Sequence, residues 1–188
     1  MTATINNIKL SIFLSLGLIF FFLSSATFTS GQTVIYIVRH AEKDLRNPSD
    51  NNPNLSQEGR ERVEALNKLL RRESISAVFS TKYNRTMQTV APVAQRNGTP
   101  VQTYIEANKE FADMVKTEFA NKKILISGHS NTVPGLIKSF GLIPPMDALT
   151  DEDYDLLFIV SIDRKGTATL KTEHYGKAHH QTAIPGLK

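Results

Sequence analysis

Cysteine and tryptophan are absent from this chain of 188 residues. The lack of cysteine excludes disulfide bonds, thiolate-bound metals and a cysteine nucleophile. Aromatic residues make up only 8% of the chain, so nothing indicates a surface on which nucleobases or sugars stack. The formal net charge of +4 is small and spread along the sequence, which argues against nucleic acid as a partner.

Charged residues are scarce in the first thirty positions, where Lys9 alone is charged. An apolar block at residues 10–23 follows this lysine, and small residues then lead to Gly31. This order predicts a secretory signal peptide over residues 1–31, cleaved near Gly31. The alternative is a retained anchor, because the apolar stretch can be extended to Phe28 and then approaches the roughly 20 residues that cross a bilayer.

Both interpretations place residues 32–188 on the far side of the membrane, because the positive charge before the apolar block stays inside. We therefore expect a bacterial exported protein that is periplasmic or extracellular, or membrane-anchored if the segment is not cleaved. No membrane contact is expected beyond that N-terminal segment. Residues 32–188 have the length of one domain and contain no linker, internal repeat or low-complexity tract.

Hydrophobic periodicity in this domain alternates between strand and helix patterns. The first helix is expected to turn Val63, Leu66, Leu69 and Leu70 inward, and the second Met87, Val90 and Val93 or Ala94. Strands separated by helices predict a three-layer α/β sandwich with a mainly parallel central sheet and an antiparallel hairpin near the C-terminus. The expected strands are 33–38, 77–80, 101–104, 123–127, 156–162 and 168–173, and the expected helices begin at 56, 84, 108 and 131.

Basic and polar side chains follow three of the expected strands. In open α/β sheets, ligands bind beyond the carboxyl ends of the strands, and a helix N-terminus there favours an anion. The sequence therefore predicts a phosphate pocket at this edge of the sheet. The residues concerned are Arg39 and His40 after the first strand, Arg85 after the second, and His129, Ser130 and Asn131 after the fourth.

Four motifs in order carry a family resemblance: residues 39–43 (RHAEK), 55–60 (LSQEGR), 80–89 (STKYNRTMQT) and 127–131 (SGHSN). Together they resemble the histidine phosphatase superfamily, also called phosphoglycerate mutase-like, over nearly the whole of residues 32–188. Within it, the chain is similar in compactness to the bacterial phosphohistidine phosphatases.

The resemblance implies a phosphatase that acts on a small phosphorylated molecule. His40 would be the nucleophile and would carry the phosphoryl group as phosphohistidine. Arg39, Arg85 and His129 would surround the phosphate oxygens, and Ser130 and Asn131 would add contacts. This scheme requires no metal and no other cofactor.

Two carboxylates are assigned by the same resemblance. Glu106 is the candidate proton donor to the leaving group, although the compact phosphohistidine phosphatases manage without that acid, because a leaving imidazole needs less help than an alkoxide. Glu42 is a second candidate for this role, although at its position it is expected to orient its neighbours through hydrogen bonds. Gly59 is expected to allow the helix that starts after Ser56 to approach closely.

Three alternatives stay open: a phosphoglycerate-type mutase, a protein phosphohistidine phosphatase, and a module that binds a phosphorylated ligand without catalysis. The short chain between Arg85 and His129 has no long insertion to form a lid, which favours hydrolysis over a mutase. The sequence identifies neither the substrate nor the oligomeric state. His174, His179 and His180 are interpreted as surface residues, and residues 151–155 as a solvated loop leading into a strand.

Overall fold

The computed structural model describes residues 31–180, which form one compact unit with a six-stranded sheet and helices on both faces. The expected signal peptide lies outside the described residues, apart from Gly31. Within residues 31–180, no helix combines the length and apolar character needed to cross a membrane.

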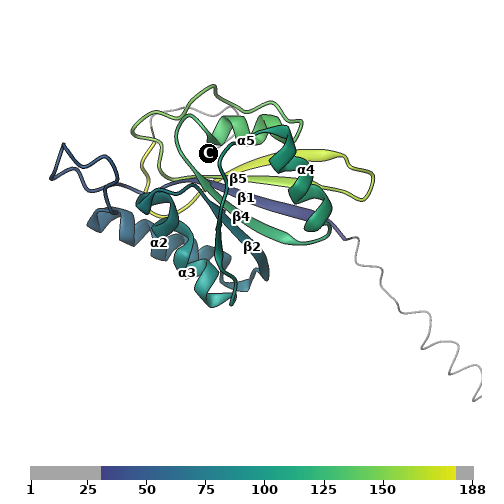
Figure 1. Cartoon of the computed structure of the whole chain (residues 1–188), viewed down its shortest axis with the longest axis horizontal. Helices are drawn as coiled ribbons and strands as arrows, with labels where there is room; N and C mark the ends of the chain where they lie inside the picture. The colour runs from purple at the N-terminus through teal and green to yellow at the C-terminus, as the bar shows by residue number, and fades with distance from the viewer. Residues whose placement is uncertain (1–30, 181–188) are drawn as a thin grey trace, which may run out of the picture. The chain divides into compact units, whose positions relative to one another are not determined.

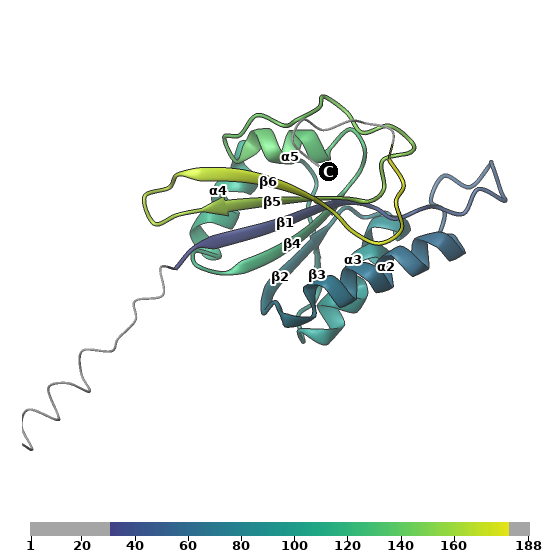
Figure 2. The same cartoon turned by 180° about the vertical axis from the view of Figure 1, so that it is seen from behind.

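The sheet has the strand order β3-β2-β4-β1-β5-β6 (Figure 2). Its first four strands run parallel, whereas β5 is antiparallel to β1 and β6 is antiparallel to β5. Gly166, with φ of 82°, lies in the turn of the C-terminal hairpin, in a backbone region that favours glycine. The strands are β1 (Thr33–Arg39), β2 (Ile75–Ser80), β3 (Val101–Thr103), β4 (Lys123–Gly128), β5 (Leu156–Ile162) and β6 (Ala168–His174).

The helices cover the sheet from both sides, with α2 and α3 on one face and α4 and α5 on the other (Figure 1). Ser56 caps α2 by accepting a hydrogen bond from the Gly59 N–H, and Asn108 caps α4 in the same way. Pro134 lies in the first turn of α5, where its missing N–H is tolerated. The elements are α2 (Gln57–Leu69) with the 3-10 turn η1 (Leu70–Arg72), α3 (Asn84–Arg96), α4 (Lys109–Glu118) and α5 (Val133–Ser139).

Strand β1 is buried on both faces and contributes to two hydrophobic cores. Ile35 and Ile37 pack in the core under α4 and α5, while Tyr36 and Val38 pack in the core under α2 and α3. Alternate side chains of a strand point to opposite faces, so a continuous apolar run supplies both layers. The predicted three-layer α/β sandwich with its antiparallel hairpin is confirmed.

Two residues assigned to the inward faces of helices were placed wrongly. Leu69 is 45% exposed and Met87 is 37% exposed. The helical turn that brings Leu66 inward leaves Leu69 at the rim, and the adjoining η1 turn buries Leu70 in its place. On α3, Thr86 and Thr89 are buried beside Val90, because this part of the helix faces polar backbone at the strand ends rather than the apolar core.

Three of the four predicted motifs meet where β1, β4 and β2 end side by side. Arg39 is in register with Gly128, and Ser127 with Ser80. One further hydrogen bond, from the His40 N–H to the Gly128 carbonyl oxygen at 2.9 Å, joins β1 to β4 just beyond the ladder. The polar segments after these strands are therefore held next to one another by the parallel pairing itself.

Candidate active site

A cavity of about 800 Å³ opens at these strand ends, and we call it the phosphate cavity. Its lining includes all six residues that the sequence assigned to a phosphate pocket. The expected proton donor, Glu106, is not among the lining residues. The lining also includes Tyr83 and Asp151, which were not assigned. The predicted residues in the lining are Arg39, His40, Arg85, His129, Ser130 and Asn131.

His40 is held as a neutral imidazole. Its side chain is buried, and its Nδ1–H donates to the Ala41 carbonyl oxygen at 2.8 Å, which leaves the lone pair on Nε2. Burial lowers the pKa of His40 to about 3, and the positive charges of Arg39 and Arg85 add to this effect, while the bond to Ala41 opposes it. The ring is thus unprotonated and nucleophilic at neutral pH.

His129 stands next to His40, with ring centroids 5.4 Å apart. Arg85 Nη2 approaches His129 Nδ1 at 3.5 Å, so the proton of the neutral ring belongs on Nε2, which lies 2.9 Å from Thr81 Oγ1. Burial, followed by the charges of Arg85 and Arg39, lowers the pKa of His129 to about 4. Two neutral imidazoles therefore lie side by side in a positively charged pocket.

Arg85 lies in the first turn of α3 and is half-buried beside the Tyr83 ring. Its guanidinium carbon lies 4.5 Å from the centre of the Tyr83 ring, and burial lowers its pKa. The Nε atom is buried and has no hydrogen-bond partner among residues 31–180. An unpaired N–H on a buried cation is costly, and an anion that accepts from it would remove that cost.

Arg39 is fixed by the loop that precedes β5. Its Nη1 donates to the carbonyl oxygen of Thr150, and its Nη2 contacts Asp151 Oδ1 at 3.1 Å and Tyr154 Oη at 3.3 Å. Its Nε, like that of Arg85, is buried without a partner in the described part of the chain. Both arginines line the phosphate cavity, and each has one buried N–H without a partner in the described part of the chain.

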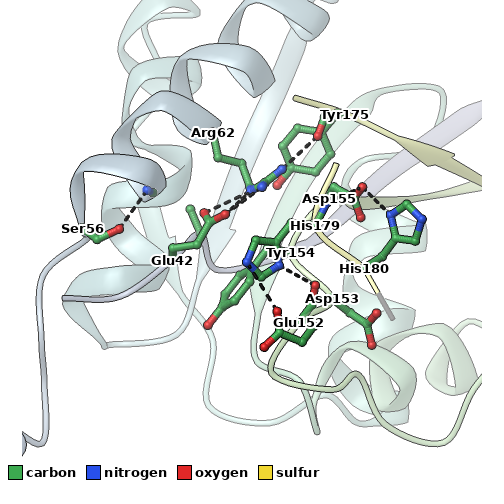
Figure 3. Close-up of polar contacts among 12 residues, drawn as sticks. Glu42, Ser56, Arg62, Glu152, Asp153, Tyr154, Asp155, Tyr175, His179 and His180 are labelled. Atoms are coloured by element: carbon green, nitrogen blue, oxygen red, sulfur yellow. Dashed lines mark hydrogen bonds and ion pairs between the residues drawn. The ribbon is translucent and has the colours of Figure 1, made fainter. Parts of the chain in front are cut away.

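The first motif is held from behind by α2 and α3. The Ala41 N–H donates to Thr89 Oγ1 at 2.9 Å, and Glu42 forms an ion pair with Arg62, with side chains 12% and 3% exposed (Figure 3). A Cβ on Gly59 would lie 2.2 Å from the Glu42 carbonyl oxygen, so the expected close approach of α2 is confirmed. Glu42 thus acts as a support, as expected, through an ion pair that the sequence did not reveal.

Glu106 is not among the residues that line the phosphate cavity. Its exposed side chain borders a neighbouring surface pocket, whereas Tyr104 and Ile105 line the cavity itself. Its one described partner is the Asn108 amide, 3.5 Å from Oε2. Within residues 31–180, the carboxylate that lines the cavity is that of Asp151, which sequence reasoning had assigned to a solvated loop.

Three residues near the cavity were missed by sequence reasoning. Thr81 follows β2 directly, so its position at a strand end was a usable signal. Tyr154 and Asp151 lie in a loop whose composition does not reveal that it folds back over Arg39.

The interpretation of residues 151–155 needs correction. Asp155 is 1% exposed and Asp153 is buried as well, so this segment is not a solvated loop throughout. The C-terminal histidines are partly exposed, as expected of surface residues, but His174 and His180 also lie against Asp155. The sequence pattern could not show this, because the contacts join residues far apart along the chain.

Comparison with protein families finds one match. Residues 35–114 match the histidine phosphatase superfamily (branch 1). The matched region includes three of the four motifs and both cavity arginines, and the resemblance expected from the sequence is confirmed. A search of curated proteins gives no match.

Solved structures share the fold at low sequence identity. The protein histidine phosphatase SixA, solved in complex with tungstate, is 20% identical with a TM-score of 0.59, over 75% of this chain and 96% of that one. A mycobacterial glucosyl-3-phosphoglycerate phosphatase is 12% identical with a TM-score of 0.59, over 77% and 98%. YhfR of Bacillus stearothermophilus is 16% identical with a TM-score of 0.60, over 78% and 98%. The family match covers residues 35–114, and the solved structures show that the fold is shared.

Proposed function

We propose that this chain, which carries the histidine phosphatase superfamily match at residues 35–114, is a metal-independent phosphomonoesterase that works through a phosphohistidine on His40. One observation supports the proposal above all others. A neutral imidazole with its lone pair on Nε2 shares a cavity with two arginines, and each arginine has a buried N–H that has no partner within residues 31–180. A nucleophile and an unfilled anion site therefore coincide.

In the first step, the phosphate of the substrate enters the cavity and its oxygens accept hydrogen bonds from Arg39 and Arg85. His40 Nε2 then attacks phosphorus, so that an N–P bond forms while the bond from phosphorus to the leaving oxygen breaks. The guanidinium groups of Arg39 and Arg85 stabilise the negative charge of the transition state. His129 Nδ1 faces Arg85 Nη2 at 3.5 Å and helps to orient that guanidinium. The leaving oxygen takes up a proton, from water or from Asp151 in the cavity lining, and departs as an alcohol.

In the second step, water attacks phosphorus and the N–P bond breaks, releasing inorganic phosphate and restoring neutral His40. Because Nδ1 donates to the Ala41 carbonyl oxygen, the ring keeps its orientation through both steps. The cationic surroundings that lower the pKa of His40 also favour the dianionic phosphoryl group that it carries.

A second candidate function, hydrolysis of protein phosphohistidine, is favoured by the position of Glu106. With Glu106 outside the lining of the cavity, the proposed acid is poorly placed to protonate an alkoxide. A phosphohistidine substrate needs little such help, because imidazole is a better leaving group. Asp151, which does line the cavity, is the alternative acid for esters.

The mutase and the non-catalytic module receive less support. A mutase must retain its substrate between two transfers, and the segment from β3 to α4 that follows Arg85 adds no long insertion over the cavity. A module that only binds phosphate has no need of a neutral histidine beside the two guanidinium donors.

Location is part of the proposal. We infer that residues 1–31 are a cleaved export signal, or an anchor, and that residues 32–188 form the catalytic domain outside the cytoplasm. The substrate would then be a small phosphorylated molecule of that compartment. N-terminal sequencing of the protein recovered from the cell envelope and the medium would check this, and an intact residue 1 in a cytoplasmic fraction would refute it.

The chemical proposal is tested by trapping the intermediate. The full chain is mixed with a ³²P-labelled aryl phosphate in the presence of EDTA, quenched within milliseconds and analysed for protein-bound label. We expect label that is stable in alkali and lost in acid, and no label in His40→Ala. An active enzyme that carries no such label would remove His40 from the nucleophile role.

The leaving group is tested with two carboxylate variants. Glu106→Gln and Asp151→Asn are each compared with wild type on an alkyl phosphate, an aryl phosphate and a phosphohistidine peptide. If Asp151 is the acid, Asp151→Asn loses activity on the alkyl phosphate and keeps it on phosphohistidine. An equal loss on all three substrates would instead indicate that the residue positions Arg39.

A further inference from the structure

A second group of titratable side chains, which we call the Asp155 cluster, lies outside the phosphate cavity. It consists of Asp155, His174 and His180. Asp155 directly precedes β5 and His174 ends β6, and antiparallel pairing places Leu156 opposite His174. His180 comes from the segment that follows β6, and Figure 3 shows its ring turned toward Asp155. None of the three lines the phosphate cavity.

The cluster converges on one carboxylate. His180 Nδ1 lies 2.7 Å from Asp155 Oδ2, and His174 Nδ1 lies 3.2 Å from the same oxygen. The backbone N–H of His179 also donates to Oδ2, at 3.1 Å. The two imidazole rings stack, with centroids 4.3 Å apart. Three nitrogen atoms thus lie close to Oδ2, whereas the other carboxylate oxygen, Oδ1, has no hydrogen-bond partner in the described part of the chain.

Two atoms of the cluster that could bind a metal ion are buried and have no hydrogen-bond partner within residues 31–180. Asp155 is 1% exposed, and within residues 31–180 neither its Oδ1 nor His174 Nδ1 has a hydrogen-bond partner. The described ion pairs of Asp155 are with the two histidines and include no lysine or arginine. A buried carboxylate without a fixed cation is unfavourable, so a cation bound at this site would be stabilised.

We propose that the Asp155 cluster binds a divalent transition-metal ion, with Zn²⁺ as the best chemical fit. Two imidazole nitrogens and one carboxylate oxygen, all within 4.8 Å of one another, form a three-ligand set of the kind that zinc accepts, with water as a fourth ligand. Mg²⁺ and Ca²⁺ prefer oxygen ligands, so they fit this set less well.

Metal binding requires a small rearrangement that the structure permits. Coordination through Nδ1 moves the ring proton of each histidine to Nε2 and turns the stacked rings until their lone pairs converge. The His180 side chain is 37% exposed and can rotate, whereas Asp155 and the end of β6 are held by the sheet. The ion would take the place of the hydrogen bond between His180 and Oδ2 and would satisfy His174 Nδ1.

Such an ion would fasten the segment after β6 to the loop that fixes Arg39. The Tyr175 N–H donates to the Asp155 carbonyl oxygen at 2.8 Å, and the Tyr154 N–H donates to the His179 carbonyl oxygen at 3.0 Å. Tyr154 in turn contacts Arg39. The metal would therefore stabilise the fold near the cavity without touching the substrate, and its existence does not depend on the proposed chemistry.

The test is a titration of the metal-free full chain with ZnCl₂ after EDTA treatment and dialysis, followed by calorimetry and thermal unfolding. We expect one ion per chain and a higher Tm in its presence. A Co²⁺-loaded sample should show the intense visible absorption of a four-coordinate site. The variants Asp155→Asn, His174→Gln and His180→Gln should each weaken Zn²⁺ binding at least tenfold and lose that absorption.

Matched variants distinguish the cluster from the other histidines of the chain. His179→Gln changes a neighbouring ring that faces Glu152 rather than Asp155, so it should bind Zn²⁺ as wild type does. His180→Gln, at a partly exposed position, keeps the test valid if Asp155→Asn does not fold. Binding that survives in His174→Gln and His180→Gln but is lost in His129→Ala would overturn the proposal, because the ion would then occupy the phosphate cavity. Failure of the wild type to bind Zn²⁺ would overturn it equally.

Discussion

The phosphate cavity and the Asp155 cluster each contain two histidines, but in opposite electrostatic surroundings. His40 and His129 lie among arginines, and burial together with those charges lowers the pKa of both. His174 and His180 lie against a buried carboxylate instead. The same side chain is thus kept neutral and nucleophilic in one place and paired with an anion in the other.

The two regions differ in which of their buried polar atoms have no hydrogen-bond partner among residues 31–180. In the phosphate cavity, the buried atoms without partners in the described chain are N–H groups of Arg39 and Arg85, which call for an anion. In the Asp155 cluster, they are a carboxylate oxygen and a ring nitrogen, which call for a cation. The identity of the unpaired atoms, rather than the number of histidines, therefore predicts the kind of ligand.

The largest expected effect separates the two regions by activity. His40→Ala removes the nucleophile, and we expect kcat for an aryl phosphate to fall by roughly 10³-fold or more. His180→Gln in the Asp155 cluster should leave kcat within about twofold in the presence of EDTA, since it touches no group in the cavity. Steady-state kinetics of both variants checks this. Similar losses of kcat in the two variants would show that the Asp155 cluster is not separate from the catalytic site.

The next effect concerns the cations around His40. Arg85→Ala removes a guanidinium that stabilises transition-state charge, and a loss of about 10²-fold in kcat is expected. Arg96→Ala, at the other end of the same helix, is the matched control and should retain activity, because Arg96 bonds to Asn67 away from the cavity. If Arg85→Ala changes only KM, the residue binds substrate without assisting the chemistry.

A third effect tests the support that lies between the two regions. Arg62 joins Glu42 of the first motif to the Tyr175 carbonyl oxygen after β6 (Figure 3). Glu42→Gln leaves the Arg62 charge buried without its partner and should lower the free energy of unfolding by about 3 kcal/mol. Urea denaturation measures this. Asp44→Asn breaks a comparable pair at the exposed Arg46 and should change stability little.

A fourth effect is a pH dependence that compares the histidines directly. The folded pKa values of His40 (about 3) and His129 (about 4) lie below the 6.5 of an unperturbed histidine. As the pH falls below 6.5, the unfolded chain takes up protons that the folded chain does not, so stability decreases towards pH 4.

Ring ¹⁵N and ¹³C NMR shifts would follow each histidine through this range. His40 should remain neutral at pH 5 with its proton on Nδ1. A titration midpoint near 6.5 for His40 would contradict the lowered pKa that its burial among arginines implies. A free energy of unfolding that does not decrease between pH 6.5 and pH 4 would contradict the expected dependence of stability on pH.

The fold could be predicted largely from local pattern. The strand expected at residues 33–38 and the helix expected to start after Ser56 rest on signals that operate within a few residues, and the structure places both elements accordingly. Leu69 and Met87 were misplaced because they lie at the border between the buried and the exposed face of their helices. Whether a residue there is buried depends on which other elements pack against the helix, and the helix sequence does not show this.

The candidate site divides in the same way. Residues that directly follow a strand, such as His40 and His129, could be located from topology alone, because parallel strands bring their carboxyl ends together. Asp151 and Tyr154 could not, since they reach Arg39 from a loop more than a hundred positions away in the chain. Glu106 shows the opposite limit: its place in sequence suggested an acid at the cavity, but the turn before α4 directs it elsewhere.

The pairing of β1 with β4 has a consequence for how the proposed activity is lost on unfolding and recovered on refolding. His40 and His129 are neighbours because Arg39 pairs with Gly128, across a separation of about ninety residues that includes β2, β3 and three helices. Contacts of such long range form late, after the intervening segment has been ordered. Recovery of catalytic turnover during refolding should therefore coincide with closure of the whole sheet, and no partly folded species should hydrolyse phosphate.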